Sequence, residues 1–152
     1  MENCIFCEII AGKAPSSVIF EDDIVLVLMT IGPVNPGHAM VIPKKHFAHI
    51  AEMDEETGAH LFKVTMRTSQ AIRESGVKCE GINLLLADGE AAFQDIFHIH
   101  MHVFPRYQGD PFRVMANWDD KPSRDELDEI AGKIGKAYKN LRCDSGNNPH
   151  DT

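Results

Sequence analysis

Three histidines at alternate positions are the part of this sequence best equipped to do chemistry. His98, His100 and His102 are separated by single large apolar residues. Such alternation predicts a half-buried β-strand with the three imidazoles on one face, about 6.5–7 Å apart at a rise of about 3.3 Å per residue. Imidazole titrates near neutral pH, attacks phosphorus and binds metals. Packing alone explains three such residues poorly, so we expect a nucleophilic or metal-binding site here.

Short strands and two helices must position this segment. Apolar runs broken by Gly, Pro and Asp turns predict the strands, and capping residues followed by apolar positions at helical spacing predict the helices. Because most strand connections are short, we expect an α+β fold with an antiparallel sheet, one long helix and one C-terminal helix. The expected strands are 17–20, 24–29, 38–42, 81–87 and the histidine strand, with helices over 55–74 and from 124 to about 141.

Composition limits the classes of function. The chain has 152 residues, which suits one domain over residues 1–142, with a polar tail over 143–152 that we expect to be disordered. A net charge of −8 argues against a general nucleic-acid or membrane-surface binder. Neither a signal peptide nor a membrane-length apolar run is evident, so the sequence predicts a cytoplasmic protein whose four cysteines are reduced or metal-bound.

The sequence resembles the histidine triad (HIT) family. Residues 98–104 match that family's motif, three histidines separated by apolar residues, throughout. The resemblance implies the HIT α+β fold and a homodimer whose sheets join. Further landmarks follow in the family's order at residues 4–10, 36–38, 41–46, 83, 94 and 105–106.

The resemblance also implies a reaction at the α-phosphate of a small nucleotide. His100, the middle histidine, would be the nucleophile and form a covalent nucleotidyl-histidine that water later releases. His102 would donate to a phosphate oxygen or the leaving group, and His38 would support the triad. Gln94 and Asn83 would donate amide hydrogen bonds to the phosphate. This scheme needs no catalytic metal.

A second set of residues overlaps the first. Cys4 and Cys7 have the spacing of a metal knuckle, and His46 and His98 can complete a tetrahedral Cys2His2 site. The spacings are similar to those of a zinc-bearing, Hint-like bacterial branch of the family, so we expect structural zinc. The alternatives are a redox pair or two packing cysteines.

Three residues depart from the commonest family pattern. Thr30 replaces an Asp or Asn that grips the ribose, Asp95 replaces a serine beside the phosphate, and Phe93 replaces a glycine. Thr30, His38, Asn83 and Asp95 are therefore our expected substrate-binding residues. Arg106 either contacts phosphate or pairs with an acid.

Three functions remain open at this point. The first is a nucleoside phosphoramidase or dinucleoside polyphosphate hydrolase, and an intact His100 favours it. The second is a nucleotide-binding or interaction module with weak or vestigial catalysis, which the substitutions at Thr30 and Asp95 favour. A purely structural zinc protein would leave His100 and His102 unexplained.

Overall fold

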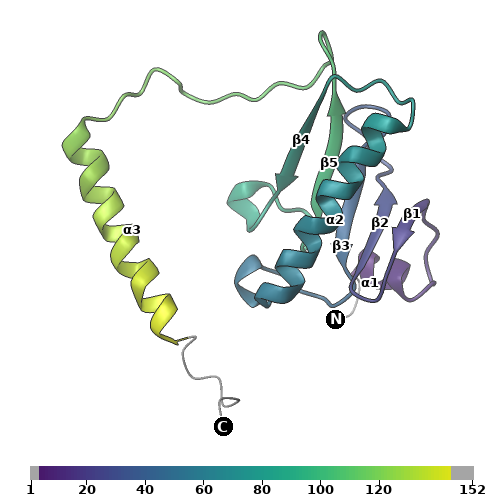
Figure 1. Cartoon of the computed structure of the whole chain (residues 1–152), viewed down its shortest axis with the longest axis horizontal. Helices are drawn as coiled ribbons and strands as arrows, with labels where there is room; N and C mark the ends of the chain where they lie inside the picture. The colour runs from purple at the N-terminus through teal and green to yellow at the C-terminus, as the bar shows by residue number, and fades with distance from the viewer. Residues whose placement is uncertain (1–3, 145–152) are drawn as a thin grey trace. The chain divides into compact units, whose positions relative to one another are not determined.

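The computed structural model describes residues 4–144 and shows an α+β fold (Figure 1). The described residues form two compact units that adjoin at Phe112 and Arg113, so the predicted domain 1–142 spans both. Residues 145–152, most of the predicted tail, lie outside the described residues. The elements are α1 (Ile5–Ile10), β1 (Val18–Glu21), β2 (Val25–Met29), β3 (Ala39–Pro43), η1 (Ile50–Glu52), α2 (Glu55–Glu74), β4 (Gly81–Leu86), η2 (Glu90–Ala92), β5 (Met101–Arg106) and α3 (Arg124–Asp144).

The first unit is built on a five-stranded sheet, and every strand pairing is antiparallel, as the sequence predicted. Its strand order is β1-β2-β3-β5-β4, so β1 and β4 form the two edges. The β1–β2 turn is tight because the Asp22 carboxylate accepts hydrogen bonds from the backbone N–H groups of Ile24 and Val25.

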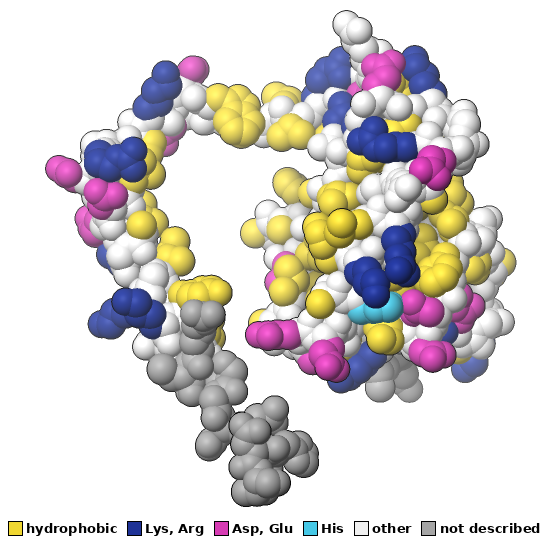
Figure 2. All heavy atoms as spheres, in the orientation of Figure 1, with side chains coloured by type: hydrophobic (Ala, Val, Ile, Leu, Met, Phe, Trp, Pro, Cys, Tyr) yellow, Lys and Arg dark blue, Asp and Glu magenta, His cyan; other side chains and the backbone are white. Residues whose placement is uncertain are grey.

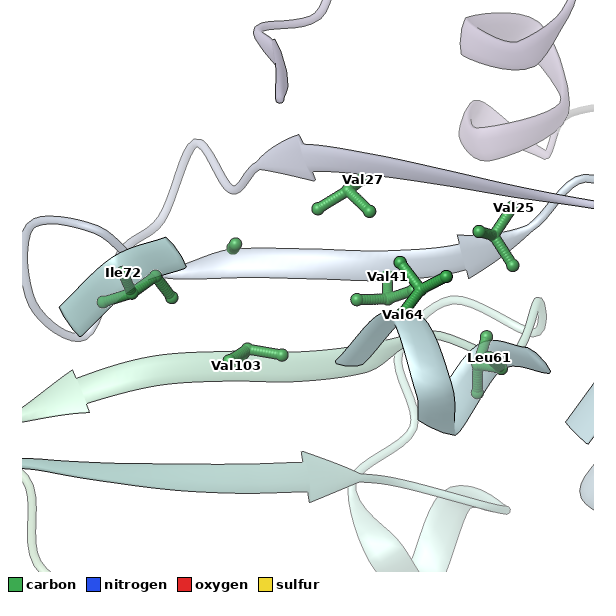
Figure 3. Packing of buried hydrophobic residues seen from close by; sticks show 8 residues of the cluster. Val25, Val27, Val41, Leu61, Val64, Ile72 and Val103 are labelled. Carbon is green, nitrogen blue, oxygen red and sulfur yellow. The ribbon is translucent and has the colours of Figure 1, made fainter. Parts of the chain in front are cut away.

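The helix α2 covers one face of the sheet. Asp54 caps its N-terminus by accepting a 2.9 Å hydrogen bond from the Thr57 N–H, which confirms the predicted cap. Apolar side chains of α2 point at valines of the central strands (Figure 3). Burial of this apolar surface holds the sheet and α2 together. The buried cluster contains Val25, Val27, Ala39, Val41, Leu61, Val64, Ile72 and Val103.

A second apolar cluster uses α1, a helix that the sequence analysis did not anticipate. Phe6 of α1 is buried against residues that alternate along β2 and β3 with those of the first cluster. Alternate residues of a strand point to opposite faces of its sheet. The N-terminal helix therefore packs on the face opposite α2. The members of this cluster are Phe6, Leu26, Leu28, Met40 and Ile42.

The histidine strand is shorter than the sequence predicted. β5 begins at Met101, and only His102 of the triad lies within it. The preceding backbone bonds elsewhere: the Ile99 N–H donates to the Phe47 carbonyl and the His98 N–H to that of Ile96. Pro43, at the end of the neighbouring β3, has no N–H with which to extend the ladder.

The second unit contains α3. The predicted capping box is confirmed. The Glu126 carboxylate accepts from the backbone N–H and the hydroxyl of Ser123, and the Glu126 N–H donates to the Ser123 hydroxyl oxygen. Apolar side chains line one side of this helix and are exposed (Figure 2). Among the described residues, no helix combines the length and apolar character that crossing a membrane requires.

Candidate active site and metal centre

His100 is buried and its ring orientation is set by the backbone. Its Nδ1 lies 2.8 Å from the carbonyl oxygen of His98. A carbonyl only accepts, so Nδ1 carries the proton and the lone pair is on Nε2. The ring also packs edge-on against Phe6, with centroids 5.1 Å apart. An imidazole held in this way could use Nε2 as a nucleophile.

A chain of hydrogen bonds also decides which nitrogen of His102 carries the proton. The Val34 N–H donates to His38 Nδ1 at 3.1 Å, so His38 must carry its proton on Nε2. His38 Nε2 lies 2.9 Å from His102 Nδ1 and donates to it. His102 therefore carries its own proton on Nε2. The Val34 amide thus makes His102 a hydrogen-bond donor beside His100, whose ring centroid is 4.8 Å away.

Burial keeps these imidazoles neutral. It lowers the pKa of His38 to about 4. Burial, followed by the neighbouring His100 and His38, lowers the pKa of His102 to about 4 as well. Both side chains are uncharged at neutral pH, as the hydrogen-bond chain requires.

The four predicted metal ligands meet in one cluster. The candidate ligand atoms of Cys4, Cys7, His46 and His98 all lie within 4.8 Å of one another. Cys4 Sγ and His98 Nδ1 are 3.4 Å apart, as are Cys7 Sγ and His46 Nδ1. A tetrahedral ion with ordinary Zn–S and Zn–N bonds would hold such atoms about 3.5 Å apart. The donor set and its spacing therefore fit a closed four-ligand site.

The Cys2His2 cluster and His100 are supported by the same residues. His98 Nε2 donates to the Pro43 carbonyl at 2.8 Å, which leaves Nδ1 unprotonated toward the cysteines. Phe6, between the two cysteines in sequence, packs against the rings of both His98 and His100. Binding a metal would thus anchor α1, and with it the Phe6 ring that packs on His100.

The structure shows bonds within the protein for both predicted phosphate donors, but only in Gln94 do they use the donor group. The buried Gln94 donates from Nε2 to the carbonyls of Ala48 and Ile96 and accepts at Oε1 from the Gly89 N–H. Its amide joins the loop that precedes the triad to the loop after β3. Asn83 on β4 pairs with Phe104, and its Oδ1 accepts from Arg106.

The departures from the family pattern lie in loops around the site. Thr30 Oγ1 accepts from the Gly32 N–H at 3.3 Å, so the hydroxyl folds back on its own loop. Asp95 is exposed, and its charge lies close enough to His102 to raise the pKa of that histidine, against the larger lowering by burial. Phe93 is 91% exposed and takes a left-handed backbone conformation (φ 64°), which favours glycine.

Two site residues were missed in the sequence. Asn35 and Asp110 are polar yet both are 2% exposed, and they hydrogen-bond each other. Asp110 also pairs with Arg106, so the acid-pair alternative for that arginine is the observed one. A turn-like Gly109-Asp110-Pro111 sequence was the only local signal, and it does not distinguish a buried carboxylate from a solvated one.

Comparisons with known proteins agree on one family. The HIT domain model matches residues 11–109. "Protein hit" of Bacillus subtilis is 40% identical over 137 residues, covering 89% of this chain and 94% of the relative. An adenosine 5'-monophosphoramidase of Schizosaccharomyces pombe is 31% identical over 138 residues, covering 90% and 99%. The crystal structure of a Zn-bound histidine triad family protein from Mycobacterium smegmatis superposes with a TM-score of 0.70 at 38% identity, covering 88% and 96%.

Proposed function

This chain belongs to the HIT family, and on that premise we propose that it hydrolyses nucleoside phosphoramidates or dinucleoside polyphosphates at the α-phosphate. The observation that carries the proposal is the 2.8 Å bond from His100 Nδ1 to the His98 carbonyl, which leaves Nε2 as the nucleophile. The phosphoramidase activity named for the Schizosaccharomyces pombe relative supports this reaction class.

The reaction has two displacements. His100 Nε2 attacks the α-phosphorus, a P–Nε2 bond forms, and the P–N or P–O bond to the leaving group breaks. The leaving group takes its proton from solvent. The imidazolium that results keeps its Nδ1–H on the His98 carbonyl. Water then attacks phosphorus, the P–Nε2 bond breaks, and nucleoside monophosphate, a proton and neutral His100 are released.

His102 stabilises the charge on the phosphoryl group. Its Nε2–H, set by His38, donates to a phosphoryl oxygen without giving up the proton. Gln94 holds the loop beside the site, and it can donate to phosphate only by exchanging a bond it makes to a backbone carbonyl. Asp95, His38, Thr30 and Asn83 remain the proposed surroundings of the substrate.

The metal that we propose for the Cys2His2 cluster is zinc. The thiolate and imidazole donors suit it, and the Zn-bound structure from Mycobacterium smegmatis supports the choice. Zinc held by Cys4, Cys7, His46 and His98 would have no position left for substrate, so its role is structural. The assembly that we propose is a homodimer joined at the exposed edge strand β4.

A nucleotide-binding module with weak catalysis is the second candidate. It is favoured by Thr30, whose hydroxyl accepts from the Gly32 N–H and which departs from the Asp or Asn that the family resemblance leads us to expect there. Such a protein would bind adenosine monophosphate and turn over neither class of substrate.

Hydrolysis by wild type and His100→Ala separates these candidates. We expect wild type to release AMP from adenosine 5'-phosphoramidate or diadenosine tetraphosphate, and His100→Ala to be at least about 1,000-fold slower. Mass spectrometry of rapidly quenched wild type should show an adenylylated chain that the variant lacks. His60→Ala is the matched control and should retain full activity, since His60 of α2 bonds Asp22 in the β1–β2 turn and not a residue of the triad. Folded, zinc-loaded wild type that cleaves neither substrate would reject the enzyme.

A further inference from the structure

A buried carboxylate lies beyond the catalytic histidines. The Asp110 side chain is 1% exposed, and Arg106 grips both of its oxygens, Nε on Oδ2 at 2.5 Å and Nη2 on Oδ1 at 2.8 Å. The same guanidinium also bonds Asn83 and the Phe112 carbonyl. These bonds of Arg106 are thus made to other groups of the protein. The proposed reaction does not explain the purpose of this buried charge pair.

Asn35 connects this pair to the loop that carries His38. Its Nδ2 donates two 2.9 Å bonds, one to Asp110 Oδ2 and one to the Pro105 carbonyl. Both amide hydrogens are thereby used, and the side chain cannot rotate without breaking them. The backbone carbonyl of Asn35 accepts a 3.1 Å hydrogen bond from the His38 N–H, which closes the turn over residues 35–38.

Aromatic contacts join the same residues by a second route. The Phe112 ring packs on the Arg106 guanidinium at 4.6 Å and on Phe104, with ring centroids 5.1 Å apart. Phe104 in turn packs on the His38 ring, with centroids 4.9 Å apart. The Arg106–Asp110 pair is therefore connected both to the backbone turn that carries His38, through Asn35, and to the His38 ring, through Phe112 and Phe104.

The residue that decides the His38 tautomer is the direct neighbour of Asn35. The Val34 N–H must point at His38 Nδ1 for His38 to donate to His102. We propose that Asp110 is a positioning residue that holds Asn35, so that the 34–38 turn keeps His38 and His102 in the tautomers needed for phosphate binding. The role given to His102 rests on the proposed function, whereas the tautomer assignment does not.

Asp110→Asn tests this inference by a spectroscopic signature. In long-range ¹H–¹⁵N spectra of the zinc-loaded protein, wild-type His38 and His102 should each show a single tautomer protonated on Nε2. We expect the variant to show a mixture of tautomers at both rings and a kcat lowered about 10–100-fold with KM little changed. Unchanged tautomers in the variant would overturn the proposal, whatever happened to kcat.

Two further variants complete the test. Asp22→Asn is the matched control, because Asp22 also bonds two backbone N–H groups and a histidine, His60, outside this network. It should leave the tautomers and kcat unchanged, so a loss there equal to that of Asp110→Asn would reduce the effect to general destabilisation and overturn the proposal. Asn35→Ala removes the link while keeping the Arg106–Asp110 pair, and it should reproduce the tautomer mixture if Asp110→Asn does not fold. If wild type cleaves no nucleotide, the proposed function fails while the spectra still decide the positioning role.

Discussion

At the scale of single residues, the site is a set of histidines whose protons are assigned by backbone groups. The carbonyls of His98 and Pro43 accept from His100 and His98, and the Val34 N–H determines His38 and, through it, His102. Each ring is thereby restricted to one tautomer without a carboxylate partner. Neutral donors and acceptors would suit the phosphate-binding site that we propose.

The lowered pKa values should make folding stability depend on pH. Unfolded histidine titrates near 6.5, whereas burial lowers the pKa of His38 to about 4. As pH falls from 7.5 to 5, the unfolded chain takes up protons that native His38 and His102 refuse, so the free energy of unfolding should fall. Each group can contribute roughly 2 kcal/mol over this range.

Urea unfolding of zinc-loaded wild type and His38→Asn at both pH values measures this effect. We expect the loss of stability on acidification to be about 1–2 kcal/mol smaller in the variant. His49→Asn is a suitable control, because His49 is half-exposed beside Asp88. Equal losses in wild type and His38→Asn would show that His38 is not held neutral.

At the scale of elements, the active site depends on the contacts between loops more than on a strand. His98 and His100 precede β5, where Ile99 bonds Phe47 and Gln94 bonds Ala48. α1 completes this region by packing Phe6 on both histidines. A helix of six residues is too short to persist alone in water, so its position depends on its packing and its cysteines.

Removing the proposed metal should therefore destabilise the fold. When the free metal concentration is about 1,000 times the Kd, binding adds about 4 kcal/mol to the free energy of unfolding. This corresponds to a Tm change of about 10 °C for a chain of this size. We expect a chelator to lower Tm by this order and to reduce activity, because Phe6 then loses its anchor beside His100. Calorimetry with metal analysis checks this.

Cys7→Ser and Cys79→Ser form a matched pair for this experiment, since Cys79 lies outside the cluster and bonds the Gly81 carbonyl. Cys7→Ser should lose the metal and the chelator response, and Cys79→Ser should keep both. Wild-type protein that keeps all its cysteines, is isolated without metal and shows the same Tm with and without chelator would contradict the zinc proposal.

At the scale of the whole molecule, exposed apolar residues indicate surfaces that a second chain can cover. The edge strand β4 exposes Leu84 and Leu85, at 40% and 50%, and α2 exposes Phe62 and Met66. An unpaired apolar edge is open to strand pairing. This supports the proposed dimer in which two sheets join at β4.

Leu84→Glu tests that interface without entering the triad. Leu84 pairs with Val103 and not with His102, so it lies on the sheet face that α2 covers. A carboxylate there should repel its counterpart across a two-fold axis, and light scattering should show a monomer. Ile19→Glu is the matched control on the opposite edge strand, where Ile19 is 47% exposed, and should stay dimeric. A monomeric wild type would rule the dimer out.

The sequence by itself determined the family, the antiparallel α+β fold and the chemical groups available. These follow from local patterns: the alternation at 98–104, the Cys4–Cys7 spacing, and the caps at Asp54 and Ser123. Such signals can be recognised in the sequence because each depends on residues within a few positions of one another.

Only the tertiary structure decided how those groups are held. The proton of His98 depends on Pro43, 55 residues away, and the tautomer of His102 depends on His38, 64 residues away. Asn35 and Asp110, separated by 75 residues, are two buried polar side chains whose partners no local pattern reveals. Burial and hydrogen-bond satisfaction are properties of contacts distant in sequence, and therefore α1, the late start of β5 and the direction of Arg106 emerged only in the folded chain.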